Sequence, residues 1–262
     1  MQDGMAGRIR SSLAWWCLEQ AGLAPPEIIR LAAAAGYDGI ELAEPEWWPA
    51  IAGAGLAVAA HRGHASLEVG LNRRGEHDRI EDELLANIDL AARWGFPTLI
   101  CFSGNRDGLS DEAGLEATAE GLRRVAPAAE RAGVSLAVEL LNSRVDHPGY
   151  QCDRTPWGVR LLDLVGSPAV SLLYDVYHMQ IMEGDVIRTI RGNARAFSHY
   201  HVAGNPGRNE PDASQELQYG PIYRAISGTG FSGWVGMEFV PTGDPLASFR
   251  AAREALASAV AG

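Results

Sequence analysis

The chain has 262 residues, 47% of them apolar, which is enough to bury a sizeable core in one large domain or two small ones. Its 33 acidic residues outnumber 22 basic ones, and the formal net charge of −11 argues against nucleic acid as a partner, because phosphate backbones attract basic surfaces. All 22 basic residues are arginine, so the lack of lysine excludes enzymes that form a Schiff base on a lysine amine.

The first seven residues predict a disordered tail ahead of a single domain over residues 8–262. This tail lacks the apolar run of a signal peptide, and no later stretch reaches the roughly 18 consecutive apolar residues of a membrane span. We therefore expect a cytoplasmic protein without a membrane partner. Cys17, Cys101 and Cys152 are too far apart for a zinc knuckle or a disulfide framework, and we expect buried thiols.

Short apolar or β-branched segments recur about every thirty residues, each followed by a helical pattern. They predict eight strands, near residues 11–17, 38–42, 56–61, 98–103, 135–140, 170–176, 196–202 and 233–239. Eight alternations in a chain of this length predict a (β/α)₈ TIM barrel, an α/β fold. A doubly wound sheet is the alternative, but the G-x-G-x-x-G fingerprint of that fold does not follow the first strand.

The intervening segments carry helix start and stop patterns. The helix from Pro26 stops at Gly36, Thr155 is the expected N-cap of a helix that closes at Gly166, and Asp244 opens the last helix. Between the third and fourth strands, one helix face carries Ile80, Leu84, Ile88 and Ala91.

Alternation along the strands predicts which residues point into the barrel. In the fifth strand, Leu136, Val138 and Leu140 should face the helices, which leaves Glu139 as the last inward residue. The same alternation makes Asp175, His201 and Glu238 the late inward residues of the next three strands, at separations of 36, 26 and 37 residues.

A single carboxylate at a strand end is more often a helix cap than a ligand, but four such groups at matching depth favour a site. The ends of adjacent strands meet at the catalytic face of a barrel, so the four can converge on one divalent metal ion. Oxygen and imidazole ligands suit Mn²⁺ or Mg²⁺, with Co²⁺ or Zn²⁺ as alternatives. His199 lies deeper and is expected to be a hydrogen-bonded core residue. His61, at the end of the third strand, is a candidate for lining the substrate pocket.

Longer stretches resemble a known family. The segments "VELLNSRVDHPGY", "LLYDVYHMQIMEGDVIRTI", "HVAGNPGRNEPD" and "QELQYGPIYRAI" are similar to the hydroxypyruvate isomerase group of the xylose isomerase-like TIM barrels. The resemblance implies that Glu139, Asp175, His201 and Glu238 bind the metal, and that Glu139 and Glu238 are the catalytic pair that transfers a proton.

The resemblance also implies a set of substrate-binding residues. His178 would hydrogen-bond a substrate oxygen, Arg208 would meet a carboxylate or hydroxyl, and Glu210 would support the site. In many hydroxypyruvate isomerases the position of His201 is a glutamine, whereas the ketose 3-epimerases have histidine there, as this chain does.

Two functions therefore stay open. The first is an aldose-ketose type isomerase that converts a small hydroxy-oxo acid through an enediolate, hydroxypyruvate to tartronate semialdehyde; the second is a ketose 3-epimerase or another sugar isomerase. Metal-dependent hydrolysis of DNA is disfavoured, since it needs more histidines and a basic surface, and a sensor is disfavoured because both glutamates are present. The small-molecule substrate is the expected partner. A homo-oligomer stays open, with Trp47 and Trp48 expected at the pocket mouth or at a subunit contact.

Overall fold

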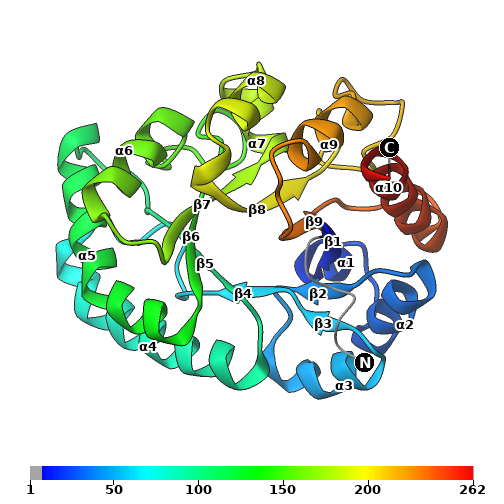
Figure 1. Cartoon of the computed structure of the whole chain (residues 1–262), viewed down its shortest axis with the longest axis horizontal. Helices are drawn as coiled ribbons and strands as arrows, with labels where there is room; N and C mark the ends of the chain where they lie inside the picture. The colour runs from blue at the N-terminus through cyan, green and yellow to red at the C-terminus, as the bar shows by residue number, and fades with distance from the viewer. Residues whose placement is uncertain (1–7, 262) are drawn as a thin grey trace. The chain divides into compact units, whose positions relative to one another are not determined.

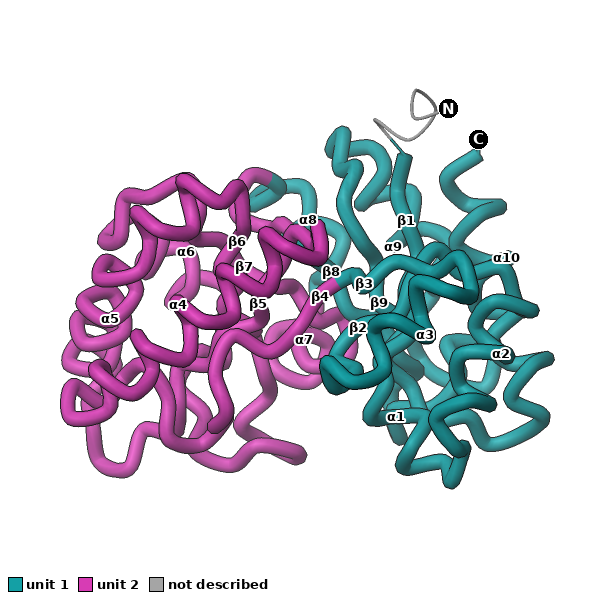
Figure 2. Tube along the Cα trace, turned by 90° about the horizontal axis from the view of Figure 1, so that it is seen from below, with its two compact units in different colours: residues 1–59, 185–194, 199–262 teal, residues 60–184, 195–198 magenta. Residues whose placement is uncertain are grey.

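The structure is a computed structural model that describes residues 8–261 (Figure 1), and it divides into two compact units (Figure 2). Unit 1 comprises residues 1–59, 185–194 and 199–262, and unit 2 comprises residues 60–184 and 195–198. The predicted tail, residues 1–7, lies outside the described residues. Within residues 8–261, no helix combines the length and apolar character needed to cross a membrane.

Unit 1 is built on a parallel sheet with the strand order β3-β2-β1-β9-β8. Helix α10 packs against α2 and α9, and α8 also packs against α9. Its elements are β1 (Arg10–Ala14), α1 (Trp15–Gln20), α2 (Pro25–Ala35), β2 (Gly39–Glu41), η1 (Pro45–Trp47), α3 (Trp48–Gly53), β3 (Ala57–Val58), α8 (Val186–Gly192), β8 (Phe197–Val202), α9 (Tyr219–Ser227), β9 (Trp234–Met237) and α10 (Pro245–Val260).

Unit 2 repeats the alternation of parallel strand and helix, with the strand order β7-β6-β5-β4. Figure 1 shows α4, α5 and α6 following one another along these strands, and α5 packs against both of its neighbours. Its elements are β4 (Ala60–Arg62), η2 (Arg74–Glu76), α4 (His77–Trp94), β5 (Thr98–Cys101), α5 (Asp111–Ala132), β6 (Ser135–Glu139), α6 (Thr155–Val165), β7 (Val170–Asp175) and α7 (Val176–Met182). A short 3₁₀ helix, η3 (Ala194–Ala196), leads into β8, whose first two residues belong to unit 2.

Several predicted helix boundaries are confirmed. Ile80, Leu84 and Ile88 form the buried face of α4, and α2 ends at Gly36 with the left-handed backbone that glycine adopts readily. The Asp244 side chain accepts a hydrogen bond from the backbone of α10, as an N-cap does.

The N-cap prediction at Thr155 is wrong. Arg154 is the extended residue before α6, and Thr155 already belongs to the helix. The Glu183 carboxylate accepts hydrogen bonds from the Thr155 amide at 2.9 Å and from its hydroxyl at 2.8 Å. A side chain from a distant part of unit 2 therefore satisfies the helix end that a local cap was expected to satisfy.

The predicted third strand is divided in two, because its halves pair with different neighbours. β3 pairs with β2, whereas β4 pairs with β5. The predicted first strand is also shorter than expected, since α1 begins directly at Trp15.

Side-chain contacts in unit 2 confirm the predicted alternation of β6. The Ser135 and Ser171 hydroxyls lie 2.7 Å apart on one face of the sheet. On the other face, a Cβ added to Gly158 of α6 would come within 2.8 Å of Leu172 and 3.4 Å of Leu140. Leucines therefore face the helix, and Glu139 shares the face of Ser135 by the two-residue period of a strand.

The three cysteines are buried thiols, as predicted. Trp48, which was expected at the surface, is fully buried, and its indole donates a hydrogen bond to the carbonyl of Ala43. Trp47 stacks on Trp15 with ring centroids 6.1 Å apart. Trp48 therefore belongs to the core of unit 1 and lies neither at a pocket mouth nor at a subunit contact.

Candidate active site

Glu238 follows β9 in unit 1 and is held by three side chains. Its Oε1 accepts a hydrogen bond from the Trp16 indole at 2.8 Å, and its Oε2 lies 3.1 Å from Nδ1 of His201 and contacts the Arg208 guanidinium. The Arg208 guanidinium also lies over the Trp16 ring, 4.9 Å from its centroid. The register pairs His201 with Gly236, which puts His201 and Glu238 on the same face of the sheet, as alternation predicted.

Charge keeps this carboxylate ionised despite its burial. Burial raises the pKa of Glu238, but the charges of His201 and Arg208 and the Trp16 hydrogen bond outweigh it, and the pKa lies well below its ordinary value. Trp16 was missed by the sequence interpretation, because residues 15–17 were assigned to a strand.

Glu41, at the end of β2, is a second buried carboxylate that sequence interpretation missed. Its Oε2 accepts from the Ser12 hydroxyl at 2.9 Å and meets Nε2 of His199 at 2.9 Å, and its Oε1 lies 2.7 Å from Nε2 of His201. Burial raises the pKa of Glu41, but the two imidazoles outweigh it and bring the pKa to about 2. The hydrogen-bonded core role predicted for His199 is confirmed, and Glu41, His199 and His201 offer ligand atoms that lie within 4.8 Å of one another.

In unit 2, Glu139 ends β6 and Asp175 ends β7, and both side chains are buried. The register pairs Glu139 with Leu173, so Asp175 lies two residues further along on the same face. Asp175 is also the N-cap of α7, since its Oδ1 accepts from the amide of His178 at 3.1 Å. The Asp175 carboxylate therefore caps α7 and is also the predicted metal ligand.

His178 is fully buried in α7, next to Asp175 and Asn142. Its Nε2 lies 3.5 Å from Oδ2 of Asp175, and its Nδ1 lies 2.6 Å from Nδ2 of Asn142. Asn142 was not singled out from the sequence, although it stands in the "VELLNSR" stretch that resembles the family. It follows β6 by three residues and is also fully buried.

The remaining predicted substrate residues differ in their placement. The register pairs His61 with Leu99, on the sheet face opposite Glu139, and the His61 ring meets Phe96 edge-on. Burial, with Arg62 nearby, lowers the pKa of His61 to about 4. This placement argues against a substrate contact for His61.

Glu210 fastens a loop in unit 1. Its carboxylate accepts hydrogen bonds from the amide and hydroxyl of Thr242 and from the Ser248 hydroxyl. The backbone of Val240 also donates to the carbonyl of Arg208 at 2.9 Å. These contacts tie the loop that carries Arg208 to the segment after β9, and the predicted role of Glu210 in the substrate site stays a prediction.

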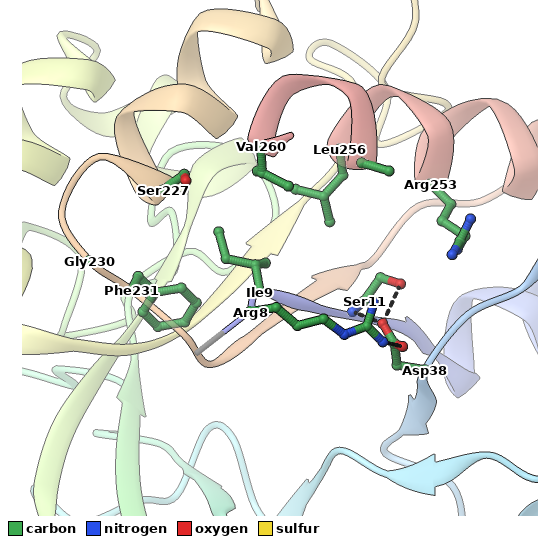
Figure 3. A pocket seen from close by; sticks show the side chains of 11 residues that line it. Arg8, Ile9, Ser11, Asp38, Ser227, Gly230, Phe231, Arg253, Leu256 and Val260 are labelled. Carbon is green, nitrogen blue, oxygen red and sulfur yellow. Dashed lines mark hydrogen bonds and ion pairs between the residues drawn. The ribbon is translucent and has the colours of Figure 1, made fainter. Parts of the chain in front are cut away.

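A separate pocket of about 370 Å³ lies at the other end of the unit 1 strands (Figure 3). Arg8 and Ser11 border it together with Asp38, which accepts hydrogen bonds from both. Because Ser11 stands near the start of β1, whereas Glu41 and Glu238 stand at or beyond strand ends, this pocket is distinct from the candidate active site.

The structure thus brings the predicted residues together in pairs. His201 and Glu238 meet in unit 1, and Glu139 and Asp175 share one sheet face in unit 2. The convergence of all four on one ion stays a prediction.

Comparison with known proteins identifies the family. The chain matches the model of the xylose isomerase-like TIM barrel family over residues 29–259. The hydroxypyruvate isomerase of Escherichia coli is 31% identical over 189 residues, which are 72% of this chain and 70% of that protein. The 2-oxo-tetronate isomerase of Cupriavidus necator is 36% identical over 133 residues, half of each chain.

Solved structures agree on the fold. The D-psicose 3-epimerase of Clostridium cellulolyticum aligns with a TM-score of 0.79 at 18% identity, over 96% of this chain and 99% of that one. The predicted (β/α)₈ barrel is confirmed by the family match. The chain belongs to the xylose isomerase-like TIM barrel family and is an isomerase of the hydroxypyruvate isomerase type.

Proposed function

We propose that the enzyme converts hydroxypyruvate to tartronate semialdehyde, with one divalent metal ion bound by Glu139, Asp175, His201 and Glu238. The proposal rests mainly on one observation: Glu238 is a buried carboxylate that is kept ionised, and the Arg208 guanidinium lies beside it. The similarity to the Escherichia coli hydroxypyruvate isomerase supports the choice of substrate. We further propose that the reaction takes place in the cytoplasm.

The donor set fits a divalent ion. The four side chains are three carboxylates and one imidazole, all buried, and each stands within one residue of the end of its strand. Such a set suits Mn²⁺ or Mg²⁺ first, with Co²⁺ or Zn²⁺ as alternatives. A bound ion would supply a Lewis acid that stabilises negative charge developing on the substrate oxygens.

The two glutamates account for the proton transfers. Hydroxypyruvate carries a CH₂OH group next to its ketone, and removal of a C3 proton by one carboxylate gives the enediolate. The partner carboxylate returns a proton to C2, and the proton of the C3 hydroxyl passes to the C2 oxygen, so that C3 becomes the aldehyde and C2 carries the hydroxyl. Substrate and product are isomers, so no oxidant or reductant is needed.

Arg208 accounts for binding of an acid. The net charge of −11 repels anions at long range, so a local cation is required. The Arg208 guanidinium can pair with the substrate carboxylate through its planar fork, and the Trp16 ring below it limits its orientation.

Proton NMR in D₂O with Mg²⁺ present tests the proposal. Wild-type enzyme should remove the methylene signal of hydroxypyruvate, and Glu139→Gln and Glu238→Gln should not. Glu254→Gln, which changes an exposed glutamate of α10, is the matched control and should behave as wild type. An unchanged methylene signal with wild type and each of the four ions would contradict the proposal.

A ketose 3-epimerase is the second candidate, and His201 favours it, because the resemblance noted in the sequence implies a histidine at this position in those enzymes. The same experiment separates the two functions when ketoses are offered beside hydroxypyruvate. Deuterium at C3 of a ketose, with hydroxypyruvate unchanged, would favour epimerisation.

A further inference from the structure

We propose that Asn142 is a positioning residue that fixes His178 as a neutral imidazole with its hydrogen on Nε2. The inference rests on the proposed function in one respect: it takes His178 to face the substrate. It makes His178 a hydrogen-bond donor to a substrate oxygen and excludes it as the base that removes the substrate proton.

The orientation of the Asn142 amide is settled by its own backbone contacts. Its Oδ1 accepts hydrogen bonds from the amides of Val145 and Asp146, both at 2.9 Å. An amide nitrogen cannot accept at that position, so the oxygen must stand there. The NH₂ group is therefore on the opposite side.

Two acceptor atoms lie within hydrogen-bond distance of this NH₂ group. Nδ2 lies 2.6 Å from Oδ2 of Asp146 and 2.6 Å from Nδ1 of His178. Because the amide nitrogen only donates, Nδ1 of His178 must be the acceptor. In a neutral imidazole the hydrogen is then on Nε2.

Nε2 is on the side of the ring next to Asp175, a predicted metal ligand. Nε2 lies 3.5 Å from Oδ2 of Asp175, longer than the 2.7–3.2 Å usual for N–H···O bonds. Asp175 Oδ1 also caps α7 through the His178 amide, which fixes the backbone that carries the ring. Both His178 and Asn142 are fully buried, so water does not compete for these contacts.

A donor at this place suits the enediolate. Negative charge develops on the substrate oxygens as the proton leaves, and a preformed N–H donor stabilises it without rearrangement. The class of ligand recognised is thus an oxygen that accepts a hydrogen bond, either a carbonyl or a deprotonated hydroxyl.

The test is the position of hydrogen on the His178 ring. Long-range ¹H–¹⁵N spectra of metal-free protein with ¹⁵N-labelled histidine, recorded at about pH 8, distinguish the two neutral forms. His178→Gln assigns the signal by its disappearance. Wild type should carry the hydrogen on Nε2, and hydrogen on Nδ1 in wild type would overturn the proposal.

Asn142→Asp is the informative variant. It keeps the oxygen that Val145 and Asp146 contact but replaces the donor with an acceptor. Because the new oxygen would also lie against the Asp146 carboxylate, the change is made together with Asp146→Asn, and hydrogen should then appear on Nδ1 of His178. Asp146→Asn alone is the matched control. It changes the other acceptor of Nδ2, whose Oδ2 lies 3.9 Å from Nδ1 of His178 and so beyond hydrogen-bond reach, and it leaves the 2.6 Å contact between Asn142 and His178 in place; its His178 ring should match wild type.

Turnover and Mn²⁺ binding complete the test. With hydrogen on Nδ1 alone, Asn142→Asp together with Asp146→Asn should lower kcat by about 10²–10³-fold, as the loss of one oxyanion donor does, while Mn²⁺ affinity changes little. If the ring carries hydrogen on both nitrogens, the donor is kept, and turnover near that of wild type is expected. An unchanged ring, or full turnover with hydrogen on Nδ1 alone, would overturn the proposal.

The ring spectrum needs neither metal nor substrate, and the wild-type spectrum decides even if the double variant does not fold. Wild type that binds Mn²⁺ but leaves hydroxypyruvate and ketoses unchanged would refute the proposed function alone. The role of Asn142 would then still be decided by the spectra.

Discussion

Arg208→Lys is the change that most directly tests how the enzyme binds an acid. Lysine keeps the positive charge but loses the planar fork and the stacking on Trp16, whose ring centroid is 4.9 Å from the guanidinium carbon. The Arg208 side chain is only 15% exposed, so water replaces little of what is lost.

The magnitude follows from the contacts. A hydrogen bond to a charged group contributes about 1.5–3 kcal/mol, and each ~1.4 kcal/mol corresponds to a factor of ten. We therefore expect kcat/KM for hydroxypyruvate to fall by about 10–100-fold. Most of the loss should appear as a higher KM, because the carboxylate is bound alike in the ground state and in the transition state.

Steady-state kinetics with saturating Mg²⁺ measure both constants. Arg250→Lys, which alters an exposed arginine of α10, should leave them unchanged. A fall in kcat at constant KM would show that Arg208 acts on the transition state alone, and wild-type kinetics would remove it from the site.

Three further outcomes follow from the contacts described above. Trp16→Phe removes the indole donor to Glu238, so the pKa of that carboxyl should rise, and the acidic limb of the pH dependence of kcat/KM should move upward with it; an unmoved limb would show that the donor has no effect on Glu238. Leu84→Ala should lower the free energy of unfolding in urea by about 2–5 kcal/mol, whereas Leu85→Ala, at a position 37% exposed, should change it by less than about 0.5 kcal/mol. The pKa of His61 is lowered from 6.5 to about 4, so the unfolded chain binds the proton first and stability should fall as the pH drops from about 6.5 to about 4. His61→Gln should remove up to about 3 kcal/mol of that loss, and equal pH dependence in both proteins would show that the pKa of His61 is not lowered in the folded protein.

Strand alternation was sufficient to predict which residues of a strand share a face. Glu139 is on the face of Ser135, and His201 is on the face of Glu238, because the two-residue period of a strand holds whatever lies around it. Glu41 follows the same rule, but β2 has only three residues, which is too short a run for alternation to identify.

Contacts between distant segments could not be predicted in this way. The helix that begins at Trp15 interrupts an apolar run that is equally compatible with a strand, so the indole that meets Glu238 was overlooked. At α6, a threonine before a proline has the pattern of an N-cap, yet Glu183 supplies the acceptor from 28 residues away. Local sequence carries no information about such a partner.

The tie between the Arg208 loop and the segment after β9 has a consequence for redesign of specificity. Val240 donates to the carbonyl of Arg208, and Glu210 holds Thr242 and Ser248. A loop transplanted from a related enzyme without its matching segment would leave the donors on Val240, Thr242 and Ser248 without these acceptors. Residues 203–218 and 238–248 should therefore be exchanged as one cassette when a new substrate is sought.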